Sequence, residues 1–368
     1  MVGSIRVLLS SDFHVNVYSW RREIIDDLID QGAKVSIAVP YGEKLEYFKS
    51  RRCKLYDINL DRSSLGIINN IILLIQYYKT LSIEKPDIVL LYGSKSMLYP
   101  GIICRIKGIK YIANVNGFGT VESMNSIVKN IIFTLYKMVI PYASCVFFQN
   151  EYNFHKFTEM NIISNNNCLI PGSGVNLEKY DILEYPDGDR VTFLFCARLI
   201  QEKGIFHFLE AAKILKTEGI NAEFDIIGMG DSGIIEKVLE NHDIVNYHGF
   251  QSNVKQFIKK AHCIVLPSYY GEGISNSLLE SAASGRPIIT TDMPGCRETV
   301  KHGETGYIIK PKNTYDLVMA MKKFIKLSIT ERITMGKKAR NYIENNFDRK
   351  IVEKAYLREI KKALEMEE

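Results

Sequence analysis

Two glutamates, Glu272 and Glu280, enclose a run of small residues in the stretch EGISNSLLE. Gly273 permits a tight turn in which the backbone approaches a ligand closely. The two leucines near the end of the stretch predict a helix over residues 274–284, with its N-terminus just after the first glutamate. Because two carboxylates then flank a helix N-terminus, this stretch could bind a ligand that carries both hydroxyl groups and phosphate.

The first turn of this predicted helix is the candidate phosphate site. The backbone N–H groups of Ile274, Ser275 and Asn276 lack a partner within a helix that begins here, and such groups attract anions. Glu280 could accept hydrogen bonds from ribose hydroxyls, and Glu272 from a sugar. The arrangement predicts a nucleotide-sugar site, and the alternative is a loop glutamate followed by a solvated helical one.

A second stretch, ARLIQEKG, carries two cations after a predicted strand. Arg198 lies at the end of that strand and Lys203 in the loop beyond it. Two fixed positive charges would neutralise a diphosphate, most strongly as negative charge builds on a leaving group. A solvated basic loop is the alternative interpretation.

A glycine pattern in IIGMGDSG suggests a dinucleotide site but is not favoured. Gly228, Gly230 and Gly233 match G-x-G-x-x-G between a predicted strand and a helix. The acidic residue expected about 20 positions further on is missing, and His248 stands in that region.

No metal site is expected from the sequence. Asp187 and Asp189 form a D-x-D pattern, but they lie among turn-forming residues in a predicted linker. The seven cysteines are scattered, with no C-x-x-C or Cys/His cluster, so neither zinc nor a disulfide framework is predicted. Reduced thiols in a cytosol fit this usage best.

The first half of the chain offers weaker candidates for an acceptor-side site. Asn116 and Gly117 follow a predicted strand in NVNGFGT, and Lys95 follows another in GSK. The asparagine could bond a sugar hydroxyl, the glycine permits close backbone approach, and the lysine supplies a cation. Each is also compatible with an ordinary loop.

Length and composition favour a globular protein of two domains. The chain has 368 residues, of which 46% are hydrophobic and 24% charged. The net charge of +5 is too mild to predict nucleic-acid binding. The N-terminus does not resemble a signal peptide, and no apolar run is long enough to predict a membrane span. The nearest candidate, residues 65–78, contains two asparagines and a glutamine and is predicted to be a buried helix.

Apolar strands alternate with helices along the whole chain, which predicts parallel sheets covered on both faces. The predicted strands are residues 5–11, 33–40, 86–92, 110–115, 145–150, 190–199, 222–228, 245–250, 262–267, 287–291 and 306–310. The predicted helices include residues 20–31, 67–81, 98–107, 126–143, 314–326, 330–345 and 349–366.

Three segments follow from this pattern. Residues 1–175 are expected to form an acceptor-side domain and residues 176–346 a nucleotide-sugar domain, with a Gly- and Pro-rich linker over residues 171–189. Residues 347–368 are expected to form a helix that packs back toward the N-terminal domain. Ligands of such sheets bind at the carboxyl ends of the strands, and the expected site is a cleft between the two sheets.

The helix predicted over residues 126–143 is basic and amphipathic. Lys129 and Lys137 lie on a different face from its many apolar side chains. A helix half buried in the core is one interpretation, and a basic face that docks on an anionic membrane is the other.

Taken in order, these motifs resemble the retaining glycosyltransferases of family four, and the match covers nearly the whole chain. The resemblance rests on the E-x7-E pair Glu272 and Glu280, on Arg-x4-Lys-Gly in ARLIQEKG, and on IPGSGVN, ASGRPII and HGETGYII. It implies an α/β protein of the GT-B fold, in which two Rossmann-like, doubly wound domains face a central cleft.

The resemblance also implies a UDP-sugar or another nucleotide-sugar donor, retention of the α configuration, and no metal or other cofactor. The implied roles are diphosphate binding by Arg198 and Lys203, ribose binding by Glu280, donor-sugar binding by Glu272 and the backbone after it, and base contacts by Gly249 and Phe250. Transfer could proceed on one face of the sugar, with the departing diphosphate accepting the proton, or through a covalent intermediate on Glu272.

The first domain departs from the family pattern. Members commonly place a histidine near the reacting carbon, but NVNGFG has Asn114 and Asn116 instead. The glycine-rich turn that many members carry after the first strand is replaced by SSDFHVN. These differences affect the expected acceptor-side contacts.

Residues 93–120 look most like bacterial enzymes that extend lipid-linked oligosaccharides for capsule, O-antigen lipopolysaccharide or protein glycans. This implies a polyprenyl-diphosphate-linked saccharide acceptor and a cytoplasmic protein attached peripherally to the inner face of the plasma membrane. A nucleotide-sugar epimerase of the same fold and a non-catalytic nucleotide-sugar sensor are the alternatives. An epimerase would convert a UDP-sugar alone, and a sensor would bind a donor without turnover.

Overall fold

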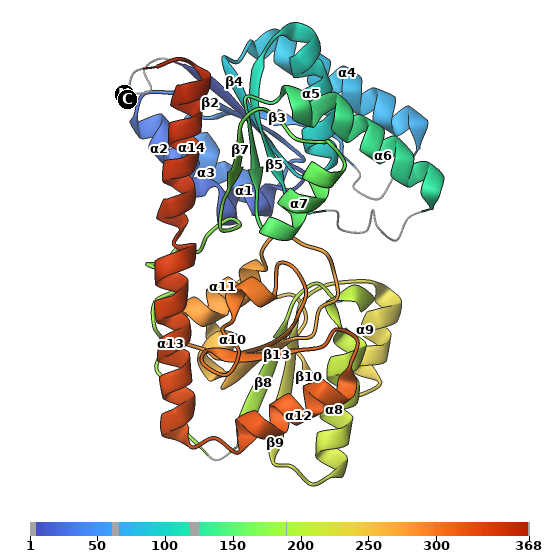
Figure 1. Cartoon of the computed structure of the whole chain (residues 1–368), viewed down its shortest axis with the longest axis vertical. Helices are drawn as coiled ribbons and strands as arrows, with labels where there is room; N and C mark the ends of the chain where they lie inside the picture. Colours follow the sequence, from blue (N-terminus) through green and yellow to red (C-terminus); the bar gives the residue numbers. More distant parts are fainter. Residues whose placement is uncertain (1–4, 61–65, 118–124, 189, 367–368) are drawn as a thin grey trace. The chain divides into compact units, whose positions relative to one another are not determined.

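The computed structural model describes residues 5–60, 66–117, 125–188 and 190–366. The chain divides into two compact units (Figure 1). One comprises Met1–Ser173 together with Lys350–Glu368, and the other comprises Gly174–Arg349. Each unit is built on a parallel sheet with helices on both faces, and each is described by itself.

The first unit contains seven strands in the order β3-β2-β1-β4-β5-β6-β7, and all neighbouring pairs are parallel. The strands are β1 (Arg6–Ser10), β2 (Lys34–Val39), β3 (Lys54–Asp57), β4 (Ile88–Tyr92), β5 (Lys110–Val115), β6 (Cys145–Phe148) and β7 (Asn167–Leu169). The central strands are apolar throughout because both faces are covered, and β4 is buried at every position. The strand order reverses between β1 and β4, where sheets of this kind bind ligands.

Helices cover both faces of this sheet, in two separate hydrophobic clusters. One face carries α4 (Ile67–Glu84), α5 (Lys95–Lys107), α6 (Ser126–Val139) and α7 (Glu151–Glu159). The other carries α1 (His14–Trp20), α2 (Arg22–Asp30), α3 (Glu46–Ser50) and the C-terminal helix α14 (Arg349–Ala363). Val352, Tyr356 and Ile360 of α14, spaced four apart, are buried in this second cluster.

The helix expected over residues 20–31 is confirmed as α2, and α1, which was not predicted, precedes it. One prediction about a helix in this unit was wrong. The helix expected to be buried near residues 65–78 is largely exposed: in α4 only Leu73, Tyr77, Thr80 and Leu81 are buried. Apolar residues occur on both sides of α4, so their spacing alone could not distinguish a buried helix from an exposed apolar one.

The second unit contains six strands in the order β10-β9-β8-β11-β12-β13, again all parallel. The strands are β8 (Val191–Cys196), β9 (Ala222–Ile227), β10 (Asn246–Tyr247), β11 (Cys263–Leu266), β12 (Ile288–Thr291) and β13 (Gly306–Ile309). The helices are α8 (Ile205–Thr217), α9 (Ser232–Leu239), α10 (Lys255–Lys260), α11 (Asn276–Ala283), α12 (Thr314–Ile325) and α13 (Ile329–Phe347). The strand order reverses between β8 and β11.

The Gly- and Pro-rich stretch expected to be a linker packs against the second unit. Val175 and Tyr180 are buried there, and the Leu183 N–H donates to the Ser284 carbonyl at 3.2 Å. Arg286 of ASGRPII is fully buried and holds this stretch to α10. Its guanidinium donates to the carbonyls of Leu183, Glu184, Ile258, Lys259 and Ser284.

The structure gives a packing reason for the glycine pattern after β9. A Cβ at Gly228 would lie 1.9 Å from the carbonyl oxygen of Ala197, so the loop after β9 can approach the loop after β8 only without a side chain at this position. Among the described residues, no helix combines the length and the apolar character needed to cross a bilayer.

Candidate active site

The predicted donor-site residues of the second unit gather where its strand order reverses. The loop after β8 carries Arg198 and Lys203, and the loop after β11 carries Glu272. The two strands are neighbours, so their carboxyl ends place the two loops side by side. This is the position at which open parallel sheets bind ligands.

Backbone contacts hold these two loops together. Lys203 ends a 3-10 turn, and the next residue, Gly204, has a φ of +81°. A Cβ at Gly204 would lie 2.1 Å from the Pro267 carbonyl oxygen, which leaves room only for glycine. The carbonyl oxygen of Glu202 also accepts the Tyr269 N–H at 2.8 Å. The position of Lys203 is therefore fixed by the backbone on either side of it.

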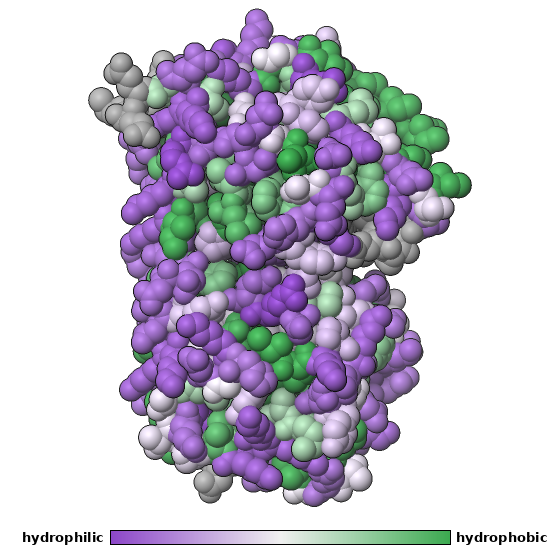
Figure 2. All heavy atoms as spheres, viewed as in Figure 1, coloured by the Kyte–Doolittle hydropathy of each residue, from purple (hydrophilic) through white to green (hydrophobic). Residues whose placement is uncertain are grey.

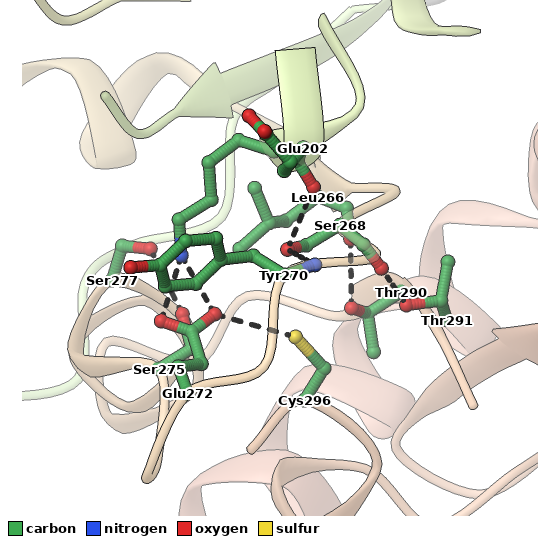
Figure 3. A network of polar contacts seen from close by, with 11 residues as sticks. Glu202, Leu266, Ser268, Tyr270, Glu272, Ser275, Ser277, Thr290, Thr291 and Cys296 are labelled. Carbon is green, nitrogen blue, oxygen red and sulfur yellow. Dashed lines mark hydrogen bonds and ion pairs between the residues drawn. The ribbon is translucent and has the colours of Figure 1, made fainter. Parts of the chain in front are cut away.

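Lys203 and Glu272 form a largely buried ion pair. The Lys203 Nζ donates to both carboxylate oxygens of Glu272 at 2.7 Å, and the two side chains are only 7% and 17% exposed. The Cys296 thiol lies beside Oε1 of Glu272, with a sulfur–oxygen distance of 3.7 Å (Figure 3). Burial, and then the negative charge of Glu272, raise the pKa of this thiol, which remains a protonated donor.

Arg198 is exposed and lies near the same lysine. Its guanidinium carbon is 5.5 Å from the centroid of the Tyr270 ring, and the Lys203 Nζ is 5.2 Å from that centroid. Both cations are within cation–π range of the same aromatic ring. Tyr270 was not identified from the sequence, although its place in the loop SYYGEG beside Glu272 was a usable signal.

The helix after Glu272 begins later than predicted. α11 starts at Asn276, with Ser275 as its N-cap, whereas the sequence predicted a start at residue 274. The Ser275 N–H donates to the Gly295 carbonyl at 2.8 Å, so it is not one of the free donors expected for phosphate. Ile274 is buried. The side-chain oxygen Oδ1 of Asn276 is buried and has no hydrogen-bond partner among the described residues.

Glu280 is the fifth residue of α11, one turn into the helix rather than two, and its side chain is half-buried. Burial raises the pKa of its carboxyl, while the positive charges of Lys179 and Arg349 and a hydrogen bond with the Tyr180 side chain oppose this effect. Tyr180, Lys179 and Arg349 were not predicted. They lie far from Glu280 in the sequence, and no local pattern links them to it.

Gly249 and Phe250 follow the short strand β10. The Gly249 carbonyl accepts the Gly228 N–H at 2.9 Å, and the Phe250 side chain is 62% exposed. An exposed aromatic ring at the carboxyl end of a strand offers a stacking surface for a planar group.

In the first unit, the predicted residue Asn116 belongs to a hydrogen-bonded network. The Gln149 side-chain amide donates to Oδ1 of Asn116 at 2.7 Å and to Oδ1 of Asn114 at 2.9 Å. The Asn114 amide donates to the Tyr356 hydroxyl at 2.6 Å. Gln149 and Tyr356 were not predicted. Gln149 directly follows β6, so its place at a strand end was a usable signal, whereas α14 brings Tyr356 here from the end of the chain.

Other predicted residues of this unit lie at the same edge of its sheet. Gly117 follows β5 with a φ of +102°, and Lys95 is the first residue of α5, after β4. Residues 118–120 of NVNGFGT lie outside the described residues. His14, after β1, was not predicted as a site residue; its Nδ1 is buried without a hydrogen-bond partner among the described residues, and burial lowers its pKa.

One group of side chains in the first unit has the composition of a metal site. Ligand atoms of Cys145, Cys168 and Glu359 lie within 4.8 Å of one another. The two Glu359 oxygens already accept hydrogen bonds from Asn166 and Arg358. The sequence did not indicate this group, because its members come from β6, β7 and α14. Of the D-x-D pair, Asp187 is exposed and Asp189 lies outside the described residues.

Comparison with known families agrees with this architecture. Residues 183–347 match the family described as Glycosyl transferases group 1, and residues 6–150 match the family described as Glycosyl transferase 4-like. The fold and these matches define a glycosyltransferase. The chain carries a group 1 glycosyltransferase domain and a glycosyl transferase 4-like segment on the GT-B fold, as the resemblance predicted.

Relatives and solved structures extend over most of the chain. A Campylobacter jejuni N,N'-diacetylbacillosaminyl-diphospho-undecaprenol α-1,3-N-acetylgalactosaminyltransferase is 27% identical over 85% of this chain and 87% of its own length. An Escherichia coli UDP-Gal:α-D-GlcNAc-diphosphoundecaprenol α-1,3-galactosyltransferase is 25% identical over 77% of this chain and 78% of its own.

Two solved structures share the fold. A glycosyltransferase from Rickettsia africae aligns with a TM-score of 0.77 at 16% identity, covering 98% of this chain and 99% of that one. The Anabaena protein HepE in complex with UDP-glucose aligns with a TM-score of 0.79 at 13% identity, covering 97% of this chain and 100% of that one.

Proposed function

We propose that this glycosyltransferase moves a sugar from a UDP-sugar to a saccharide carried on polyprenyl diphosphate, with retention of configuration, during assembly of a bacterial surface glycan. The acceptor class is supported by the Campylobacter and Escherichia relatives, whose names specify undecaprenyl-diphosphate-linked sugars. The observation that carries the chemistry is the buried Lys203–Glu272 pair beside the exposed Arg198, at the reversal point of the second sheet.

Donor binding would exchange the partners of Lys203. A diphosphate oxygen competes with Glu272 for the ammonium group, and Arg198 can reach the same diphosphate from the exposed side. The freed Glu272 carboxylate then accepts hydrogen bonds from hydroxyls of the donor sugar. The amide oxygen of Asn276, which has no hydrogen-bond partner in the described part of the chain, provides a further acceptor for a hydroxyl.

Transfer on one face of the sugar fits this arrangement better than a covalent intermediate. The anomeric carbon–oxygen bond to the diphosphate breaks, the acceptor oxygen bonds to that carbon, and the departing diphosphate takes the acceptor's proton. Arg198 and Lys203 stabilise the charge on the leaving group. Glu272 is a poor candidate nucleophile, because in the proposed donor complex its oxygens accept hydrogen bonds from hydroxyls of the donor sugar and from the Cys296 thiol.

An assay with and without acceptor tests the proposed function. We expect the enzyme and a UDP-sugar to yield an α-linked product only when a polyprenyl-diphosphate-linked saccharide is added, with the anomeric configuration read by NMR. Formation of a different UDP-sugar without acceptor would instead identify an epimerase. Donor binding without turnover on any lipid-linked acceptor would indicate a sensor.

Transfer is expected to proceed without a metal ion. Two cations and a helix N-terminus can neutralise the diphosphate, so activity should be unchanged in excess EDTA. The measurement is the initial transfer rate before and after chelation. Loss of activity that Mn²⁺ or Mg²⁺ restores would contradict this expectation. It would instead support a metal site at Asp187 and Asp189.

A lipid-linked acceptor also requires contact with a membrane surface, and we propose peripheral attachment through α6. Lys137 is exposed and Lys129 half-exposed on this helix. Each lysine near an anionic surface contributes about 1 kcal/mol. Replacing both with glutamate should therefore weaken binding to anionic vesicles at low salt, while transfer to a short water-soluble acceptor stays unchanged. Equal vesicle binding by this variant would argue against the docking face.

A further inference from the structure

The helix α4 presents a row of large aliphatic side chains to solvent. Ile67, Ile68, Ile71, Ile72 and Ile75 are between 44% and 77% exposed. Their spacing places them on one side of the helix, opposite the buried residues that face the sheet. We call these five residues the isoleucine face. Soluble proteins rarely expose so many neighbouring aliphatic residues without a binding partner.

The isoleucine face is part of a wider hydrophobic edge of the first unit. Next along this face of the sheet come α5 and α6. Ile106 at the end of α5 is 75% exposed, and Ile127 and Ile131 in α6 are 72% and 56% exposed. Hydrophobic surface is visible along the edge that carries α4 and α6 (Figure 2).

The charged residues of these three helices are almost all cationic. Glu84 is the only acidic residue within α4, α5 and α6, and it bonds Ser36, Lys54 and Tyr56 on the far side. Arg105 lies over the Tyr142 ring at 3.6 Å, and Lys107 over the Tyr78 ring at 4.2 Å. Tyrosines that carry basic groups are typical of the boundary between lipid headgroups and acyl chains.

We infer that the isoleucine face of α4 inserts into the acyl-chain boundary of an anionic lipid bilayer. A protein partner would be expected to supply acids against the basic rim, whereas anionic lipids supply both the negative charge and the apolar layer. Helices with this separation of faces lie in the plane of the membrane with the apolar side buried about 5–10 Å deep. The biological role of this surface rests on the proposed lipid-linked acceptor, but its lipid binding does not.

Insertion and electrostatic attraction differ in their response to salt. At 1 M ionic strength the Debye length falls to about 3 Å, so attraction through Lys129 and Lys137 is screened, while apolar insertion is retained. The intact chain should therefore keep much of its binding to vesicles of phosphatidylethanolamine and phosphatidylglycerol in high salt. Complete release of the intact chain in high salt would overturn the inference.

The decisive variant is Ile71→Gln with Ile75→Gln, compared by vesicle sedimentation in high salt. These residues are exposed, so Tm should be unchanged, and the partition coefficient should fall roughly fivefold to tenfold. The matched control is Ile182→Gln with Ile329→Gln, at positions 51% and 44% exposed in the second unit, which should bind like the intact chain. Equal binding by the α4 variant and the control would overturn the inference.

A second variant measures insertion without removing apolar surface. In Ile75→Trp, tryptophan emission should shift to shorter wavelength on vesicles and be quenched by brominated acyl chains, relative to the intact chain with its single Trp20. Unquenched emission would overturn the inference.

A lower oligomeric mass for Ile71→Gln with Ile75→Gln, at unchanged vesicle binding, would also overturn it and assign the face to a second copy of the chain. Transfer to a water-soluble acceptor should be the same in the α4 variants and the intact chain. Vesicle binding therefore tests the inference, and transfer tests the proposed function.

Discussion

Replacing Arg198 with alanine is expected to lower kcat at least about a hundredfold and to leave Tm unchanged. Arg198 is exposed, so its removal leaves no buried group unpaired. Its guanidinium stabilises the diphosphate as charge builds on it, and loss of one such contact costs about 2.7–4 kcal/mol in comparable sites. Single-turnover transfer rates at saturating donor would measure this loss.

The matching change at Lys203 separates catalysis from structure. Lys203→Ala should show a similar loss of kcat but also a lower Tm, because the largely buried Glu272 carboxylate loses its cation. Lys213→Ala, at an exposed lysine of α8, should change neither quantity. Near-normal turnover in Arg198→Ala or Lys203→Ala would show that the replaced residue does not stabilise the diphosphate.

The donor-side residues could be predicted because their signals are local. Each catalytic candidate lies within seven residues of a strand end, and the strands themselves are continuous apolar runs. Parallel topology then brings Arg198, Lys203 and Glu272 to one edge without any further information. What the sequence could not provide is the direct Lys203–Glu272 pair, since it depends on the close contact of Gly204 with Pro267.

The remaining features depend on contacts between distant segments. The start of α11 is set by the Ser275–Gly295 hydrogen bond, and the first-unit network is completed by Tyr356 from the C-terminal helix. The exposure of α4 was mispredicted for another reason. Its buried and exposed sides are both apolar, and hydrophobic spacing reports only that a face is apolar, not whether protein, lipid or water covers it.

Replacing Glu280 with glutamine is expected to weaken UDP binding about 10- to 100-fold. Hydrogen bonds from hydroxyls to a charged acceptor contribute about 1.5–3 kcal/mol, and the proposed ligand of Glu280 is the ribose. Inorganic diphosphate lacks a ribose, so its affinity should be unchanged. Calorimetric titration of both ligands measures the difference, and Glu210→Gln, at an exposed glutamate of α8, is the control. Equal losses for UDP and diphosphate would contradict the ribose assignment.

The same substitution should alter stability in the opposite direction. Burial raises the pKa of the Glu280 carboxyl, so the native state binds this proton more tightly than the unfolded chain does. Below the pKa that Glu280 has in the unfolded chain, its carboxyl is protonated in both states and does not lower the free energy of unfolding. As pH rises from that value through the raised native pKa, the ionised carboxylate lowers the free energy of unfolding, and the cost then persists at neutral pH. Without ligand, Glu280→Gln should therefore unfold at a higher Tm than the native chain at pH 7, and the difference should shrink toward pH 4. A lower Tm for the variant at pH 7 would show that the Tyr180 hydrogen bond and the nearby cations outweigh burial, and that Glu280 holds the fold as well as the ligand.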